Sequence, residues 1–81
     1  MQFSRPVQEQ FDVDGITCVI FEPENWYIRG SAYVIKNDVL FNEDIQVSAR
    51  SEQASMDGMR TFLTKAAGRV RQSMEHYQPD A

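Results

Sequence analysis

The feature that most constrains the fold is a change of hydrophobic period near residue 50. Residues 7–49 alternate apolar and polar side chains in short runs separated by turn residues, which is typical of β-strands. Residues 51–77 instead repeat apolar side chains every three or four positions, as one face of an α-helix requires: Met56, Met59, Leu63, Ala66, Val70, Met74 and Tyr77. The sequence therefore predicts an α+β fold, an antiparallel β-meander of three to four strands followed by one long C-terminal α-helix packed on one sheet face.

Turn residues divide the first half into strands. Asp14 and Gly15 suit the positive φ angles of a type I′ turn, which places Val13 opposite Ile16 in a hairpin. A three-residue loop at 23–25, where Pro23 removes a backbone donor, and a turn at 37–38 should join the later strands. After the first strand, the predicted strands run over residues 16–22, 26–36 and 39–49.

Two further features of the sheet are expected. The polar residues Asn42, Glu43 and Asp44 interrupt the pattern of the last strand and predict an irregularity there. A short edge strand around Phe3 is a weaker prediction, because Pro6 opposes pairing in this segment.

The helix carries its own start and stop signals. Ser51 is the expected N-cap, with Glu52 favourably placed in the first turn, and the helix should end near residues 78–79. Gly58 and Gly68 are expected to lie away from the apolar stripe. They mark either a close approach by a partner or positions where glycine is simply tolerated.

Length and composition indicate one domain over residues 1–78 with a flexible C-terminal tail at 79–81. A chain of 81 residues has room for one core and little room for a large enclosed active site. No apolar run approaches the length of about 20 residues that spans a bilayer, and the N-terminal residues lack the pattern of a signal peptide. A cytoplasmic location without membrane attachment is therefore expected. The single cysteine, Cys18, is expected to be a buried apolar residue of a strand.

Strand alternation assigns side chains to two sheet faces. One face should form the core, with the helix packing through Met59, Leu63, Ala66 and Val70 against Ile28, Val34 and Phe41, and with Trp26 also buried there. The other face should carry Val19, Phe21, Tyr27, Arg29, Tyr33, Ile35 and Leu40. A four-residue loop after Phe21 would exchange this assignment.

The second face is unusually apolar and aromatic for a surface in water, so we expect it to be covered. The cover is the N-terminal segment or a loop, a second copy of the chain in a homodimer, or a different protein. For a protein partner, the predicted interaction residues are Phe21, Tyr27, Arg29 and Tyr33, because tyrosine and arginine dominate many interface energies.

The charge distribution favours some partners over others. Residues 1–49 contain three basic and eight acidic side chains, so the sheet should repel phosphate backbones and accept a basic protein. The one basic cluster comprises Arg60, Lys65, Arg69 and Arg71. At 100° per residue these side chains flank both sides of the apolar stripe and form no single track, so nucleic-acid binding is the less favoured alternative.

No motif predicts catalysis or metal binding. His76 and the distant Cys18 cannot together build a zinc site, and the glycine in the segment Asp12–Gly15 comes too early for a calcium loop. The acidic pairs Glu22 with Glu24 and Glu43 with Asp44 should be solvated loop or strand residues. We therefore expect neither an enzyme nor a cofactor.

The order of a strand meander followed by one helix in a tiny acidic chain is similar to that of several small interaction modules. These include antitoxin-like domains and phage-encoded inhibitors of host defence such as anti-CRISPR proteins. The resemblance lies in architecture and transfers no functional residue. It implies a non-enzymatic protein-interaction module, a phage or bacterial accessory or inhibitor protein that acts by binding a partner protein.

Overall fold

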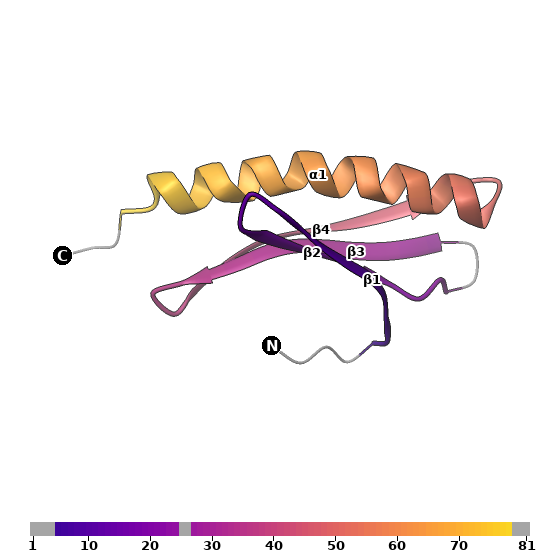
Figure 1. The fold of residues 1–81 in the computed structure, drawn as a ribbon, viewed down its shortest axis with the longest axis horizontal. Helices are drawn as coiled ribbons and strands as arrows, with labels where there is room; N and C mark the ends of the chain where they lie inside the picture. Colours follow the sequence, from indigo (N-terminus) through magenta and orange to yellow (C-terminus); the bar gives the residue numbers. More distant parts are fainter. Residues whose placement is uncertain (1–4, 25–26, 79–81) are drawn as a thin grey trace.

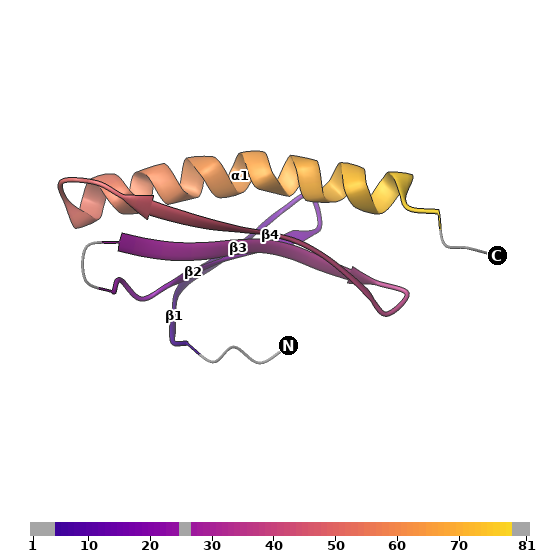
Figure 2. The same ribbon diagram turned by 180° about the vertical axis from the view of Figure 1, so that it is seen from behind.

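The fold is seen in a computed structural model that describes residues 5–24 and 27–78. The elements are β1 (Val7–Val13), β2 (Ile16–Phe21), β3 (Tyr27–Lys36), β4 (Val39–Ser48) and α1 (Glu52–His76). The strands form one antiparallel sheet in the order β1-β2-β3-β4, and α1 lies across one of its faces (Figures 1 and 2). The predicted α+β fold is confirmed. The expectations for Phe3, Trp26 and residues 79–81 fall outside the described residues.

Both predicted tight turns are present. Asp14 and Gly15 have φ angles of 50° and 87°, and the turn at 37–38 likewise has two residues of positive φ, at 52° and 66°. Aspartate, asparagine and glycine tolerate this region better than other residues, which is why these segments turn. The first turn places Val13 opposite Ile16, as predicted.

The loop between β2 and β3 differs from the prediction. A three-residue loop would place Ile20 opposite Ile28, but Ile20 instead pairs with Gly30. Glu24 and Tyr27 exchange two backbone hydrogen bonds (N···O 2.9 and 3.1 Å), so Tyr27 pairs with Glu24 and not with β2. Because the shift is two residues, every side chain keeps its predicted face.

The irregularity expected at residues 42–44 is wrong. β4 pairs with β3 without a register shift from Val39 to Ser48. A regular strand accommodates these polar residues because Asn42 and Asp44 point to the face opposite α1, while Glu43 reaches Arg69 of α1 (Nε···Oε2 2.8 Å). The register shift in the sheet lies instead in β1, between Val7 and Glu9.

The core lies between α1 and the sheet. The buried helix residues are Ser55, Met56, Met59, Leu63, Ala66, Ala67 and Val70. They pack over a sheet surface formed by Ile16, Cys18, Ile20, Ile28 and Ala32, with Val34 and Phe41 partly buried at its margin. The predicted stripe is confirmed for Met56 to Val70. Beyond Val70, Met74 is half-buried, and Tyr77 is exposed but meets Phe41 edge to face with ring centroids 5.3 Å apart.

The helix ends follow local chemistry. Ser51 caps α1 as predicted, since its Oγ accepts a hydrogen bond from the Ala54 N–H (3.1 Å). The helix ends at His76, two residues before the predicted end. Gly68 is exposed as expected, but Gly58 is half-buried and lies over Val47 of β4. The expectation that both glycines face away from the core is therefore wrong for Gly58.

Candidate protein-interaction surface

We call the sheet surface opposite α1 the open face. Neither a helix nor a strand of the described residues covers it (Figure 1). Along β3 it presents Tyr27, Arg29, Ser31, Tyr33 and Ile35, and the same face carries Val19 and Phe21 from β2 and Leu40 from β4. The β2–β3 and β3–β4 registers therefore place all seven side chains assigned to the second face together on it.

Exposure on the open face is uneven. Val19 is fully buried and Ser31 is 8% exposed, so the middle of this face is shielded from solvent within the chain. The aromatic residues assigned to it are half-buried. The most exposed apolar pair is Ile35 and Leu40, at 53% and 47%, beside the β3–β4 turn. The second face is therefore apolar and aromatic, as predicted, and part of it is already shielded within the chain.

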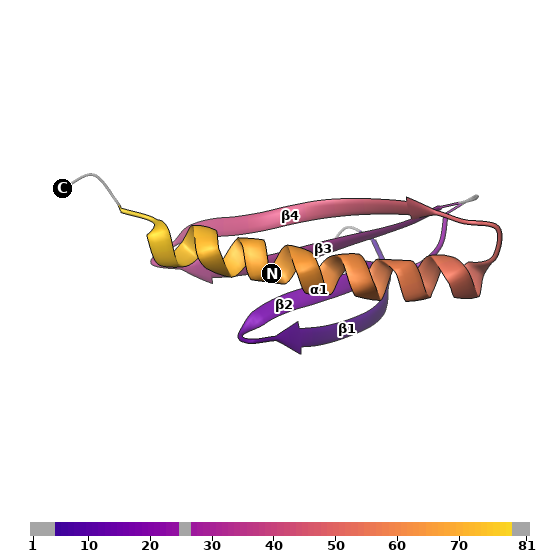
Figure 3. The same cartoon turned by 90° about the horizontal axis from the view of Figure 1, so that it is seen from above.

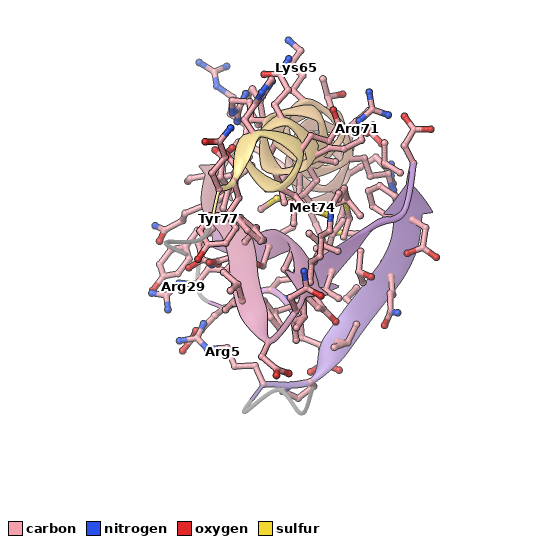
Figure 4. The ribbon with its side chains drawn as sticks, turned by 90° about the vertical axis from the view of Figure 1, so that its left-hand side faces the viewer. Arg5, Arg29, Lys65, Arg71, Met74 and Tyr77 are labelled. Atoms are coloured by element: carbon pink, nitrogen blue, oxygen red, sulfur yellow. The ribbon has the colours of Figure 1, made fainter. Side chains whose placement is uncertain are left out.

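Arg29 has the most distinctive environment on the open face. Its Nη2 donates to the Tyr27 hydroxyl (3.2 Å), and its guanidinium carbon lies 5.1 Å from the centre of the Tyr27 ring. Its Nε–H is buried and has no acceptor among the described residues. A buried donor left without an acceptor costs about 1 to 3 kcal/mol. Figure 4 shows Arg29 and Arg5 well away from Lys65 and Arg71, which project from α1.

A hollow of about 500 Å³ lies beside Arg29 on the open face. Its side-chain lining comes from Arg5, Phe21, Arg29, Asp44 and Gln46. Arg5 also pairs with Glu24 (3.0 Å), which ties the segment before β1 to the loop after β2. The lining of the hollow therefore contains basic side chains, an acidic side chain and the aromatic ring of Phe21.

The four predicted interaction residues do not form one cluster. Phe21 and Arg29 line the same hollow, and Tyr27 contacts Arg29. Tyr33 lies four residues after Arg29 on β3, which at the rise of a β-strand is a distance of about 13 Å. Sequence reasoning missed Asp44 and its neighbour Gln46. The turn at 37–38 could have placed them, because it sets Gln46 opposite Arg29.

The described residues contain no group of three or more His, Cys, Asp or Glu side chains placed to hold a metal ion. Cys18 is fully buried, as predicted, and its Sγ lies 3.8 Å from the Leu63 carbonyl oxygen. Burial, with a smaller contribution from the charge of Asp12, raises the pKa of the Cys18 thiol. The thiol is therefore a poor nucleophile in the folded chain.

The basic cluster on α1 is largely engaged with the sheet. Arg60 makes a bidentate pair with Glu9 (2.7 and 2.8 Å), Arg69 pairs with Glu43, and the guanidinium of Arg71 lies 3.3 Å from a carboxylate oxygen of Asp14. The hydrogen bonds from Arg60 lower the pKa of Glu9. These pairs fix both sides of the helix to the sheet, as snorkelling side chains do.

Comparison of the chain with protein-family models, with curated proteins and with solved structures gives no match. In the part of the chain that the structure describes, α1 is not apolar enough over its length to cross a membrane. A functional proposal therefore depends on the geometry and charge of the open face.

Proposed function

We propose that this chain is a non-enzymatic protein-interaction module that binds a partner protein through the open face. The observation that carries the proposal is Arg29, which is half-buried beside the Tyr27 ring and whose buried Nε–H has no acceptor within the described part of the chain. Arginine and tyrosine, in partly desolvated positions, are the residue types that most often dominate binding energy.

The partner surface that fits this site presents a carboxylate surrounded by apolar groups. The guanidinium already donates to one neutral hydroxyl, and a carboxylate accepts stronger, charge-assisted hydrogen bonds from its planar edge. The half-buried ring of Phe21 lines the same hollow and offers apolar contact around that pair. Binding would hide the partner's own surface, and blocking that surface is the proposed mode of action.

A second copy of the chain is the competing occupant. Arg29 and Asp44 line one hollow, so two copies related by a two-fold axis could each offer Asp44 to the partner's Arg29. Sedimentation of the wild-type chain separates the two cases. We expect a monomer. A dimer that dissociates in Arg29→Asp and reforms in Arg29→Asp with Asp44→Arg would assign the open face to self-association.

The test of partner binding uses two matched substitutions. A protein captured by the wild-type chain is identified, purified and titrated against Arg29→Gln and Lys65→Gln. Both changes remove one positive charge, but Lys65 lies on the exposed side of α1 (Figure 4). We expect Arg29→Gln to weaken binding about 10- to 100-fold, the range for a lost charge-assisted hydrogen bond, and Lys65→Gln to leave it unchanged. Equal binding by Arg29→Gln and the wild type would overturn the proposal.

A further inference from the structure

The outer edge of β4 is one of the two edges of the sheet. β4 has 10 residues and keeps an unbroken register with β3, and Figure 3 shows no described element beyond it. The backbone hydrogen bonds that join segments outside the regular elements involve the loops and the ends of α1, and among the described residues none of them involves residues 40–46 of β4. An edge of this kind is a template for another strand.

The hairpin turn determines which backbone groups face outward. Lys36 and Val39 flank the two-residue turn, so the Val39 N–H points toward β3. Because the inward and outward directions alternate along an antiparallel strand, the N–H and C=O groups of Leu40, Asn42, Asp44 and Gln46 point away from the sheet. These residues offer paired donors and acceptors to an added strand.

The opposite edge of the sheet is less suitable. β1 has seven residues, and the register shift between Val7 and Glu9 disrupts its line. Bulges of this kind twist an edge away from incoming strands, and they are a common protection against strand addition. β4 contains neither a register shift nor a proline.

The charge of β4 selects its occupant. Glu43 is paired with Arg69, but Asp44 has no ion pair among the described residues and accepts only a long hydrogen bond from Asn42 (3.5 Å). If two copies joined through antiparallel β4 strands, these central carboxylates would face one another and repel. A strand with basic side chains is attracted at the same position, so a different chain is favoured over a second copy.

Hollows lie on both sides of this edge. One of about 260 Å³ lies between β4 and α1 and is lined by Leu40, Phe41, Asn42, Glu43, Val70 and Ser73. The hollow on the open face has Asp44 and Gln46 in its lining, together with Arg5, which is paired with Glu24, and Arg29, which would bind a carboxylate of the same partner. Successive side chains of an added strand point to opposite faces, so they would enter these two hollows in turn.

We infer that the outer edge of β4 binds an extended, basic segment of a partner protein by strand addition. Its lysine or arginine side chains point to the open face and meet Asp44, and its alternate apolar side chains point to the hollow beside Val70. The inference rests on the proposed function, since it takes the partner to be a protein, and it names the segment that the partner contributes.

The probe is a peptide as long as β4, 10 residues, that alternates lysine and valine and carries a fluorescent label. Fluorescence anisotropy measures its affinity, with a glutamate and valine peptide of equal length as the control. We expect the lysine peptide to bind and its affinity to fall with added salt, and the glutamate peptide not to bind. In the complex, amide hydrogen exchange should slow at Leu40, Asn42, Asp44 and Gln46.

Peptide N-methylation tests strand pairing without altering the protein. Two peptides are compared, one N-methylated at the lysines and the other at the valines. In one of them methylation removes the N–H donors that face β4, and in the other it removes those that face solvent. We expect methylation to abolish binding in the first case and to leave it nearly unchanged in the second. Equal effects of the two methylation patterns would show that charge alone holds the peptide, and would overturn the inference.

Matched protein variants locate the site. Asp44→Lys should weaken the lysine peptide about tenfold, whereas Asp12→Lys, the same change on the exposed β1 edge, should leave its affinity close to that of the wild type. Gln46→Pro removes an outward donor of β4 and should also weaken the lysine peptide, whereas Gln10→Pro, the corresponding change in β1, should not. Equal losses in Asp44→Lys and Asp12→Lys would contradict binding at β4.

The outcomes separate this inference from the proposed function. If the lysine peptide does not bind but partner binding still depends on Arg29, only the strand addition is overturned. If the lysine peptide binds but Arg29→Gln leaves partner binding unchanged, only the role of the open face is overturned.

Discussion

Gly30 of β3 lies directly beneath Met59 of α1, so close that no side chain fits between them. A Cβ at residue 30 would lie 2.8 Å from the Met59 Sδ and 2.9 Å from the Val19 backbone oxygen. Leu63 would be a third close neighbour, at 3.2 Å. The absence of a side chain at this position therefore sets how closely α1 approaches the sheet.

We expect Gly30→Ala to destabilise the fold by about 1 to 3 kcal/mol, the usual cost of overpacking a core. Met59 has a flexible side chain and can move, but the Val19 carbonyl belongs to the sheet ladder and cannot. Urea denaturation measures the loss. Gly68→Ala is the control, because a Cβ there meets nothing within 4 Å and should stabilise the exposed helix by about 0.5 to 1 kcal/mol. Equal midpoints for Gly30→Ala and the wild type would contradict the close packing.

Leu63 is fully buried, whereas its neighbour Phe62 is 47% exposed. Truncation of a buried leucine to alanine costs about 2 to 5 kcal/mol, and an unpaired buried charge costs more. Because small domains are stabilised by only about 5 to 15 kcal/mol, Leu63→Asp should abolish the folded state, as seen by circular dichroism. Phe62→Asp should remain folded. A folded Leu63→Asp variant would refute the packing of α1 on the sheet.

The pair formed by Glu9 and Arg60 should make stability depend on pH. Hydrogen bonds from Arg60 lower the pKa of Glu9 in the folded chain, so the ionised carboxylate stabilises the fold above its unfolded pKa of about 4.3. This contribution is lost as the pH falls through the lowered folded-state pKa. The difference in urea midpoint between the wild type and Glu9→Gln should therefore be largest near about pH 7 and shrink toward about pH 3. A constant difference would show that the pair contributes nothing through charge.

Cys18 should react slowly with thiol reagents while the chain is folded. Its side chain is fully buried, and burial raises the pKa of the thiol, so little of the reactive thiolate is present near about pH 8. Reaction with Ellman's reagent should become rapid in denaturing urea. Rapid reaction in the native chain would mean that β2 opens readily away from α1.

Much of the candidate site could be placed from the sequence, because strand alternation and two tight turns set most of it. The turn at residues 14–15 fixed the face of β2, and the turn at 37–38 fixed the pairing that puts Gln46 opposite Arg29. The separation of Tyr33 from the hollow follows from its position in the strand. The environment of Arg29 does not follow from its position in the strand, because its contact with the Tyr27 ring and the burial of its Nε–H depend on side-chain rotamers and on neighbouring residues.

The sequence alone determined the elements, the two hairpin turns, the Ser51 cap and the apolar stripe of α1. Each of these depends on residues a few positions apart, through backbone φ preferences, hydrogen bonds within one turn and side-chain period. Long-range packing sets the pairing of Ile20 with Gly30, the fit of Met59 over Gly30 and the regular edge of β4. These features join residues far apart in the chain. They are settled by packing of the whole core, because a connection without a two-residue turn, such as the one after Phe21, does not specify the register of the strands it joins.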